Sequence, residues 1–380
     1  MRKKKIALIS FFTTVISILV IFVAVVVIVD PYFHFHAPLD DVFSYELSEE
    51  RYINDGIITR FDYDALITGT SMTENFKTSE MDNLFETKSI KVPYSGGSFK
   101  EIDSAIRLAT KRNKNLRYVI RGLDCSMFFF DSDYMRTDLG EYPDYLYNNN
   151  PFDDYNYIFS YKALYKSLLA IAKSVLGKKK DVFSLFDDYS NWQSSYQFGK
   201  NSVLKEEIDN VSIDVQKQMT IKMQNALRNN ILQYFVATPI ANPDITFCYF
   251  LTPYSVVYYH DLIKSGDFSV QLEAERMIVE ELSKIPNVKL YSWNDSFQIV
   301  SNLNFYKDST HYGEWVNSYM LRCMKNEKHL LTLDIFDTYK QTIEDFYFNY
   351  DFSTLNSQED YENDDDVLQL LLQYETDNDN

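Results

Sequence analysis

The sequence predicts an α/β protein built on a parallel sheet, and three strand-to-helix turns carry that prediction. Ala65–Thr68, Ser89–Val92 and Leu116–Leu123 are short runs of strand-forming residues, and a turn follows each of them. Strands that alternate with helices imply parallel pairing through right-handed crossovers. The carboxyl ends of such strands share one edge, where open α/β sheets bind their ligands.

Two later segments complete a predicted sheet of about five strands. Ile245–Thr252 has the composition of a buried strand, and Val288–Tyr291 is the last strand. We expect one α/β domain over residues 61–330, with an insertion at residues 126–235. Residues 331–380 are expected to form an appended helical and acidic tail.

The N-terminus predicts a membrane anchor, because residues 6–29 form an apolar run without a charge. A transmembrane helix needs about 20 such residues. The basic cluster Arg2–Lys5 precedes the run, so the N-terminus is expected in the cytoplasm and the main domain outside it. A cleaved signal peptide is the alternative, but Val25–Val29 offers no small-x-small cleavage site. We therefore expect residues 1–30 to be a cytoplasmic stub and anchor and residues 31–60 a juxtamembrane linker.

Composition excludes some functions. The net charge of −18 argues against nucleic acid as a partner, because phosphate binding needs basic patches. Cys125, Cys248 and Cys323 are too few and too scattered for a disulfide framework or a zinc site, and they are expected as buried small apolar residues. The alternating pair His34 and His36 is weak support for a metal site, so neither a metal nor a cofactor is predicted.

Ser71 is the candidate nucleophile, because it directly follows the first strand and its glycine turn, in Gly69-Thr70-Ser71-Met72. A helix that starts here would offer free N–H groups and a positive dipole end to an oxyanion. The alternative is that Ser71 only caps this helix, since Ser71-x-x-Glu74 also matches a capping box.

Asp308 and His311 are the candidate base and its partner. They lie one turn apart in a loop that precedes a helical pattern. Serine catalysis needs a base for the hydroxyl proton and a third group that fixes the tautomer of that base. The alternative is that Asp308 or Ser309 caps the following helix and His311 is an ordinary surface residue.

Two glycines, Gly96 and Gly97, follow the second strand and precede a helix that begins with the capping box Ser98-x-x-Glu101. Glycine permits close approach of the backbone to a ligand. The alternative is an ordinary tight turn that binds nothing.

The order of these parts resembles the SGNH (GDSL-like) hydrolases over residues 63–325. The resemblance implies a flavodoxin-like three-layer αβα sandwich and a Ser-His-Asp esterase or acyltransferase. It implies Ser71 as nucleophile, His311 as general base and Asp308 as its partner. Gly96, or the adjacent Gly97, would match the glycine of the family's oxyanion hole.

The anchor and the outward domain are most similar to the envelope members of the family, of the DltD and AlgJ/AlgX types. The resemblance implies a membrane-anchored extracytoplasmic serine esterase or O-acyltransferase. Its partners would be the membrane, through residues 6–29, and a cell-envelope polysaccharide or related glycopolymer. The aromatic and acidic residues of 128–161 suit sugar rings, with a lid packed on the sheet as the alternative. Leu164–Leu176 is expected as an amphipathic helix of the core, with an interface as the alternative.

The sequence departs from the family pattern in the third block. Asp124 stands where the family has an Asn that donates to the oxyanion, and an ionised Asp has no proton to donate. Asn54 is a candidate to take that role. The departure keeps a second class open, which is an anchored, non-catalytic binding or assembly protein of the envelope.

Overall fold

The computed structural model describes residues 2–138, 142–148, 150–178, 180–212, 216–361 and 364–377, and these residues form two compact units. The first unit combines Met1–Asp62 with Thr137–Tyr189, and the second combines Tyr63–Arg136 with Ser190–Asn380. Part of the predicted insertion, residues 137–189, therefore folds with the N-terminal residues. Residues 331–361 belong to the second unit.

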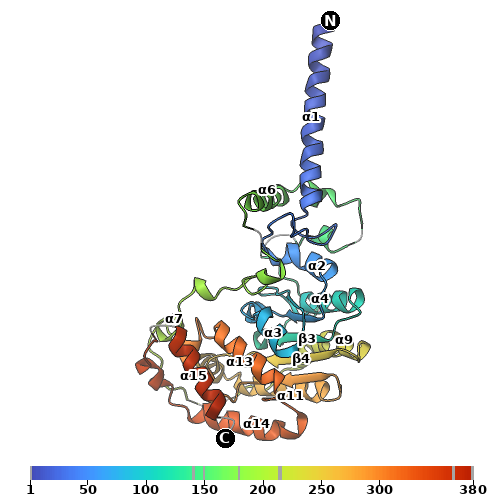
Figure 1. Cartoon of the computed structure of the whole chain (residues 1–380). Helices are drawn as coiled ribbons and strands as arrows, with labels where there is room; N and C mark the ends of the chain where they lie inside the picture. Colours follow the sequence, from blue (N-terminus) through green and yellow to red (C-terminus); the bar gives the residue numbers. More distant parts are fainter. Residues whose placement is uncertain are drawn as a thin grey trace. The chain divides into compact units, whose positions relative to one another are not determined.

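A five-stranded parallel sheet forms the centre of the second unit, as predicted (Figure 1). Its strands are β1 (Ala65–Thr68), β2 (Ser89–Lys91), β3 (Tyr118–Leu123), β4 (Thr246–Leu251) and β5 (Val288–Tyr291). The order is β2-β1-β3-β4-β5, and every neighbouring pair is parallel. The strand order therefore changes direction after β2: β2 is added on one side of β1, and β3, β4 and β5 are added on the other side.

Helices of the second unit connect and cover the strands. They are α3 (Thr78–Phe85), α4 (Phe99–Arg112), α7 (Lys200–Val203), α8 (Ile221–Asn230), the π-helix η6 (Ile231–Val236), α9 (Ala237–Ala241), α10 (Val256–Ser265), α11 (Phe268–Leu282), α12 (Phe297–Val300), α13 (Glu314–Lys325), α14 (Leu333–Asn349) and α15 (Asp364–Asp377). Short 3-10 turns lie between them. Helix α13 packs against α3, whereas α9 and η6 pack against α4. Right-handed crossovers in opposite directions from β1 and from β2 put α3 and α4 on opposite faces of the sheet.

Burial explains the composition of the strands. Leu66, Ile67, Val119, Ile120 and Phe250 are fully buried, as expected for strands that helices cover on both faces. The cysteines are free and buried, as predicted. The predicted tail is partly integral, because α14 packs on α11 with Tyr339 and Tyr347 in the core.

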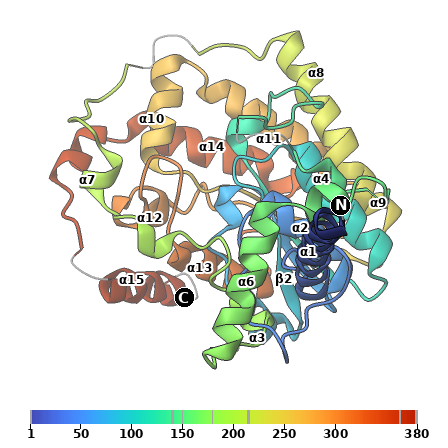
Figure 2. The same cartoon turned by 90° about the horizontal axis from the view of Figure 1, so that it is seen from above.

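The first unit is mainly helical. It contains α1 (Arg2–Val29), α2 (Glu50–Arg60), the single turn α5 (Tyr155–Ile158) and α6 (Tyr161–Val175). Helix α1 is long and apolar enough to cross a membrane. Both α5 and α6 pack against α1, and α6 runs beside its C-terminal end (Figures 1 and 2).

A carboxyl group, that of Glu275 on α11, is buried in the second unit. It accepts hydrogen bonds from the Gln271 amide at 3.0 Å and the Tyr339 hydroxyl at 3.1 Å. Burial outweighs these hydrogen bonds and raises the pKa of Glu275 from 4.5 to about 7. The folded protein therefore retains a proton on Glu275 at pH values where the unfolded chain has lost it.

This raised pKa predicts a pH-dependent stability. Between pH 4.5 and about 7 the unfolded chain loses the Glu275 proton first, so the free energy of unfolding falls as pH rises. The loss is on the order of 3 kcal/mol and is complete above the folded pKa. Glu275→Gln imitates the protonated group, so we expect a higher Tm than wild type at about pH 8 and no gain at about pH 4. Thermal unfolding at the two pH values checks this, and an equal gain at both would contradict it.

Candidate active site

Ser71 lies at the carboxyl edge of the sheet, in the turn that follows β1. It begins the 3-10 helix η1 (Ser71–Thr73), and Thr70 occupies the N-cap position with its side chain accepting from the Met72 N–H. The hypothesis that Ser71 is only a cap is therefore wrong. Gly69 is required for close approach, because a Cβ there would lie 2.6 Å from Cγ2 of Thr73.

The structure brings Ser71, His311 and Asp308 together. Ser71 Oγ lies 2.8 Å from His311 Nε2, and His311 Nδ1 lies 2.9 Å from Oδ2 of Asp308. The other carboxylate oxygen, Oδ1, accepts from the backbone N–H groups of His311 and Thr310, at 2.8 and 2.9 Å. Asp308 therefore both shapes the loop and holds the ring. It does not cap α13, where Gly313 is the N-cap residue.

Electrostatics keep Asp308 ionised. Burial opposes ionisation, but the side-chain hydrogen bond with His311, the electrostatic attraction to the His311 ring and two backbone N–H groups outweigh it. Together they hold the pKa of Asp308 well below its usual range. An ionised Asp308 accepts the Nδ1 proton of His311, so Nε2 is left with its lone pair toward Ser71.

Three hydrogen bonds fix the histidine loop to the turn after β4. The carbonyl oxygen of Ser309 accepts from the backbone N–H and the hydroxyl of Ser255, at 3.1 and 2.8 Å. The Tyr306 hydroxyl donates to the carbonyl oxygen of Pro253 at 2.8 Å. These bonds place a loop that is distant in sequence at the edge of the sheet where β1 ends.

The turn after β2 supplies the candidate oxyanion glycine. The Tyr94 N–H donates to the Gly69 carbonyl oxygen at 2.8 Å, which joins this turn to the one that carries Ser71. The Gly97 N–H is already used, because it donates to the Tyr94 carbonyl oxygen at 2.7 Å. Across the described residues, the N–H groups of Ser71 and Gly96 donate to no protein acceptor. The geometry therefore favours the N–H group of Gly96 over that of Gly97 as the candidate oxyanion donor.

Asp124 is an acceptor that joins three turns. Its carboxylate accepts from the Thr70 hydroxyl at 2.8 Å, from the Ser126 hydroxyl at 2.6 Å and from the Tyr254 hydroxyl. The Ser126 N–H adds a further bond at 3.1 Å. This side chain fixes Thr70, the residue before the candidate nucleophile, and both of its oxygens are occupied as acceptors.

Asn54, the candidate substitute donor, lies in the first unit on α2. It is fully buried there, and its side-chain oxygen accepts from the Tyr189 hydroxyl at 2.6 Å. Its role toward an oxyanion stays a prediction.

Sequence reasoning missed an aromatic wall beside the triad, formed by Trp192, Tyr196 and Phe198. The Trp192 indole N–H donates to the Ser71 carbonyl oxygen at 3.4 Å, and its ring meets that of His311 edge-on, with centroids 5.8 Å apart. Lys307 places its ammonium group 3.9 Å from the Trp192 ring centroid and 3.7 Å from that of Tyr196. Clustered aromatics in the polar stretch 190–199 were the available signal.

Comparison with models of protein families, with curated proteins and with solved structures finds no match to this chain.

The bonds of Asp124 predict the effects of two substitutions. Asp124→Ala leaves the buried Thr70 and Tyr254 hydroxyls without an acceptor, at about 1–3 kcal/mol each. Asp124→Asn keeps an acceptor oxygen, so it should lower Tm far less than Asp124→Ala. Thermal unfolding of both variants checks this, and equal losses would contradict the proposed role of the carboxylate as a shared acceptor.

The contact between the Trp192 and His311 rings predicts that Trp192 holds His311 in position. Trp192→Ala removes the ring that packs on His311, so we expect slower reaction of Ser71 with a serine-directed phosphonate probe at little cost in Tm. Trp192→Phe keeps a ring and should restore most of the rate. An unchanged rate in Trp192→Ala would show that the wall does not hold His311 in place.

Proposed function

We propose that this chain is a membrane-anchored extracytoplasmic serine esterase or O-acyltransferase that acts on a cell-envelope polysaccharide or related glycopolymer. The observation that carries the proposal is the chain of contacts from Asp308 through His311 to Ser71, with both ring nitrogens of His311 within 2.9 Å of their partners. Such a relay is the arrangement that activates a serine hydroxyl for attack on an acyl group.

The reaction would proceed in two steps. Ser71 Oγ attacks the carbonyl carbon of an ester while His311 Nε2 takes the hydroxyl proton, and His311 then returns it to the departing alkoxide oxygen. This leaves an acyl group on Ser71. A water molecule or a sugar hydroxyl next gives its proton to His311 and attacks the acyl carbon, which releases an acid or a new ester and restores Ser71.

The oxyanion that forms in each step would be held by the backbone N–H groups of Ser71 and Gly96. Both support the proposal because neither donates to a protein acceptor across the described residues. Donors that are fixed before reaction stabilise developing charge without reorganisation. The order of the strands, β2-β1-β3-β4-β5, agrees with the flavodoxin-like arrangement that the SGNH resemblance implies.

The proposed location rests on α1 and its flanking charges. A span through residues 6–29, with the basic residues 2–5 on the cytoplasmic side, would put the catalytic unit outside the membrane. An envelope glycopolymer is the substrate class that the resemblance to the anchored members implies.

A non-catalytic binding or assembly protein is the second candidate, and Asp124 is the observation that favours it. Its carboxylate is committed to Thr70, Ser126 and Tyr254, so the position that supplies a third oxyanion donor in the family is closed. Loss of one such donor costs about 10²–10³ in rate. The proposed enzyme would therefore depend on the two backbone donors.

The proposal predicts covalent labelling and ester cleavage that depend on Ser71. We expect wild type to react with a fluorophosphonate probe, and Ser71→Ala to give no labelling. His311→Ala should lose about 10⁴-fold or more in ester cleavage with the fold intact. Ser309→Ala is the matched control, because it lies in the histidine loop and uses only its backbone oxygen toward Ser255.

Ester cleavage unchanged in Ser71→Ala would refute the mechanism. A wild type that takes no probe, yet binds envelope polysaccharide, would establish the non-catalytic candidate instead.

A further inference from the structure

Helix α6 exposes an apolar face, which is the reverse of what a core helix does. We define the apolar face by its members: Tyr161, Tyr165, Leu168, Val175 and Leu176. Val175 is 82% and Tyr161 77% exposed. Successive residues of a helix are separated by about 100°, so these five side chains fall within an arc of about 100°. The expectation of a core helix at Leu164–Leu176 is therefore wrong for this face.

The opposite side of α6 faces the rest of its unit with small residues. Ala163, Ser167 and Ala170 are buried there. They allow close packing but bury little apolar area. The large apolar side chains are thus outside and the small ones inside, which costs stability in water.

The lysines of α6 are also directed into the unit. Lys173 contacts Glu46 at 2.8 Å, Lys162 contacts Glu49 at 3.3 Å, and Lys166 donates to the Ser48 hydroxyl. Each cation therefore has its partner in residues 46–49 rather than in solvent beside the apolar face. The exposed stripe carries no charge along α6.

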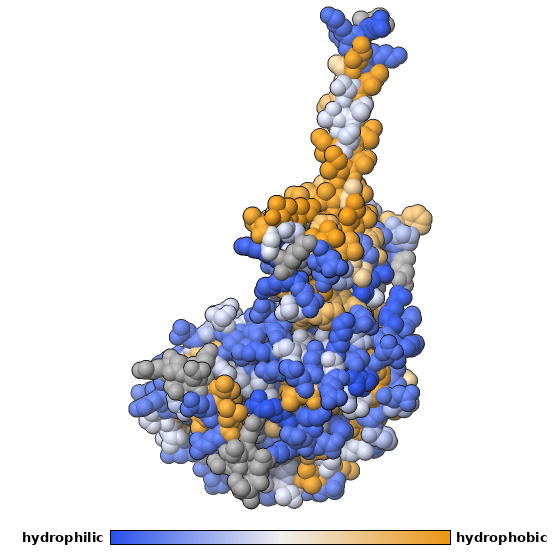
Figure 3. Space-filling view, in the orientation of Figure 1, coloured by the Kyte–Doolittle hydropathy of each residue, from blue (hydrophilic) through white to orange (hydrophobic). Residues whose placement is uncertain are grey.

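The apolar surface continues from α6 onto α1. Phe159, just before α6, stacks on Phe22 of α1 with ring centroids 5.9 Å apart. Phe152 and Tyr155 add exposed aromatic area, and Phe152 is 87% exposed. The space-filling view shows apolar surface on α1 and around its base (Figure 3).

The position of Phe22 along α1 indicates how deep Phe159 and the start of α6 would lie in a bilayer. The apolar run 6–29 is about 36 Å long at about 1.5 Å per residue, slightly more than a hydrocarbon core of about 30 Å. With the run centred in that core, Phe22 lies roughly 8 Å inside the outer boundary. Interfacial helices bury their apolar face about 5–10 Å into this boundary. Phe159 and the start of α6 are thus at the right depth.

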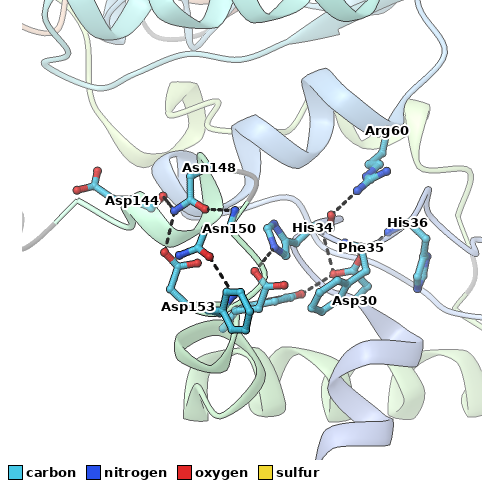
Figure 4. Close-up of polar contacts among 12 residues, drawn as sticks. Asp30, His34, Phe35, His36, Arg60, Asp144, Asn148, Asn150 and Asp153 are labelled. Carbon is cyan, nitrogen blue, oxygen red and sulfur yellow. Dashed lines mark hydrogen bonds and ion pairs between the residues drawn. The ribbon is translucent and has the colours of Figure 1, made fainter.

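A buried carboxylate fixes this arrangement. Asp30, directly after α1, accepts from the N–H groups of Phe35 and His36 at 2.7 and 2.9 Å (Figure 4). It also accepts from the Tyr157 hydroxyl of α5 at 2.7 Å. His34 adds a contact with Asp154 at 3.0 Å. These bonds tie the end of α1 to the segment that leads into α6.

We propose that α6 is a second membrane contact, which lies in the outer-leaflet interface with its apolar face in the lipid. The inference rests on the proposed span through α1, since α1 sets the depth. The occupant of this face is the bilayer itself, because the face is continuous with the helix that is long and apolar enough to span it. The tyrosines of the face suit the headgroup boundary, where their rings are buried and their hydroxyls stay hydrated.

The test is a depth measurement on the full chain in vesicles of phosphatidylcholine and phosphatidylglycerol. Spin labels are attached in three variants: Leu168→Cys on the apolar face, Leu19→Cys on α1 and Lys222→Cys on exposed α8 as the aqueous control. Native cysteines are buried. We expect the label at 168 to collide with oxygen rather than with a water-soluble nickel chelate, as at 19 and opposite to 222.

The outcomes separate the two proposals. A label in lipid at 19 with an aqueous label at 168 would overturn the interfacial contact and leave the anchor standing. An aqueous label at 19 would overturn both. A label at 168 shielded from both reagents, with crosslinking between chains, would show that a second copy covers the face and would also overturn the lipid contact.

Discussion

One buried carboxylate, that of Asp124, joins the turns on which the candidate site depends. The Asp124 carboxylate accepts a hydrogen bond from one hydroxyl group in each of the turns after β1, β3 and β4: those of Thr70, Ser126 and Tyr254. Parallel strands bring such turns to one edge, but they do not set the position of a side chain to hydrogen-bond accuracy. A shared acceptor in a buried place does so, because each donor that lost it would remain unpaired.

The identity of the side chain at position 124 has a physical consequence. An amide at position 124 could donate outward to an oxyanion, whereas a carboxylate can only collect donors. With Asp124, this position joins three turns through hydrogen bonds. Such a junction favours a rigid position for Ser71 and its N–H group. The candidate oxyanion donors are then backbone N–H groups rather than side chains.

Much of this arrangement was predictable, because it depends on local patterns. The five strands, the capping box at Ser98 and the meeting of Ser71 with His311 follow from periodicity and from the common edge of parallel strands. The aromatic cluster of Trp192, Tyr196 and Phe198 is visible in the sequence, but its position beside His311 was not predictable, since its segment has no periodicity and reaches the site by tertiary packing. The exposure of the apolar face of α6 was not predicted for another reason. Periodicity shows that a helix is amphipathic, but it does not show whether the apolar face packs in the core or lies on the surface.

The division of the chain has a consequence for its biogenesis. The first unit is discontinuous in sequence, since Met1–Asp62 is completed only by Thr137–Tyr189. At about 5–20 residues per second, the ribosome needs several seconds to deliver the second part after the first. During that interval residues 31–62 have α1 beside them but lack α5 and α6, so Asp30 does not yet have the hydrogen bond from Tyr157. Assembly of the first unit is thus ordered in time, because the segment that is synthesised last, Thr137–Tyr189, supplies the hydrogen-bond donor for the end of α1, which is synthesised first.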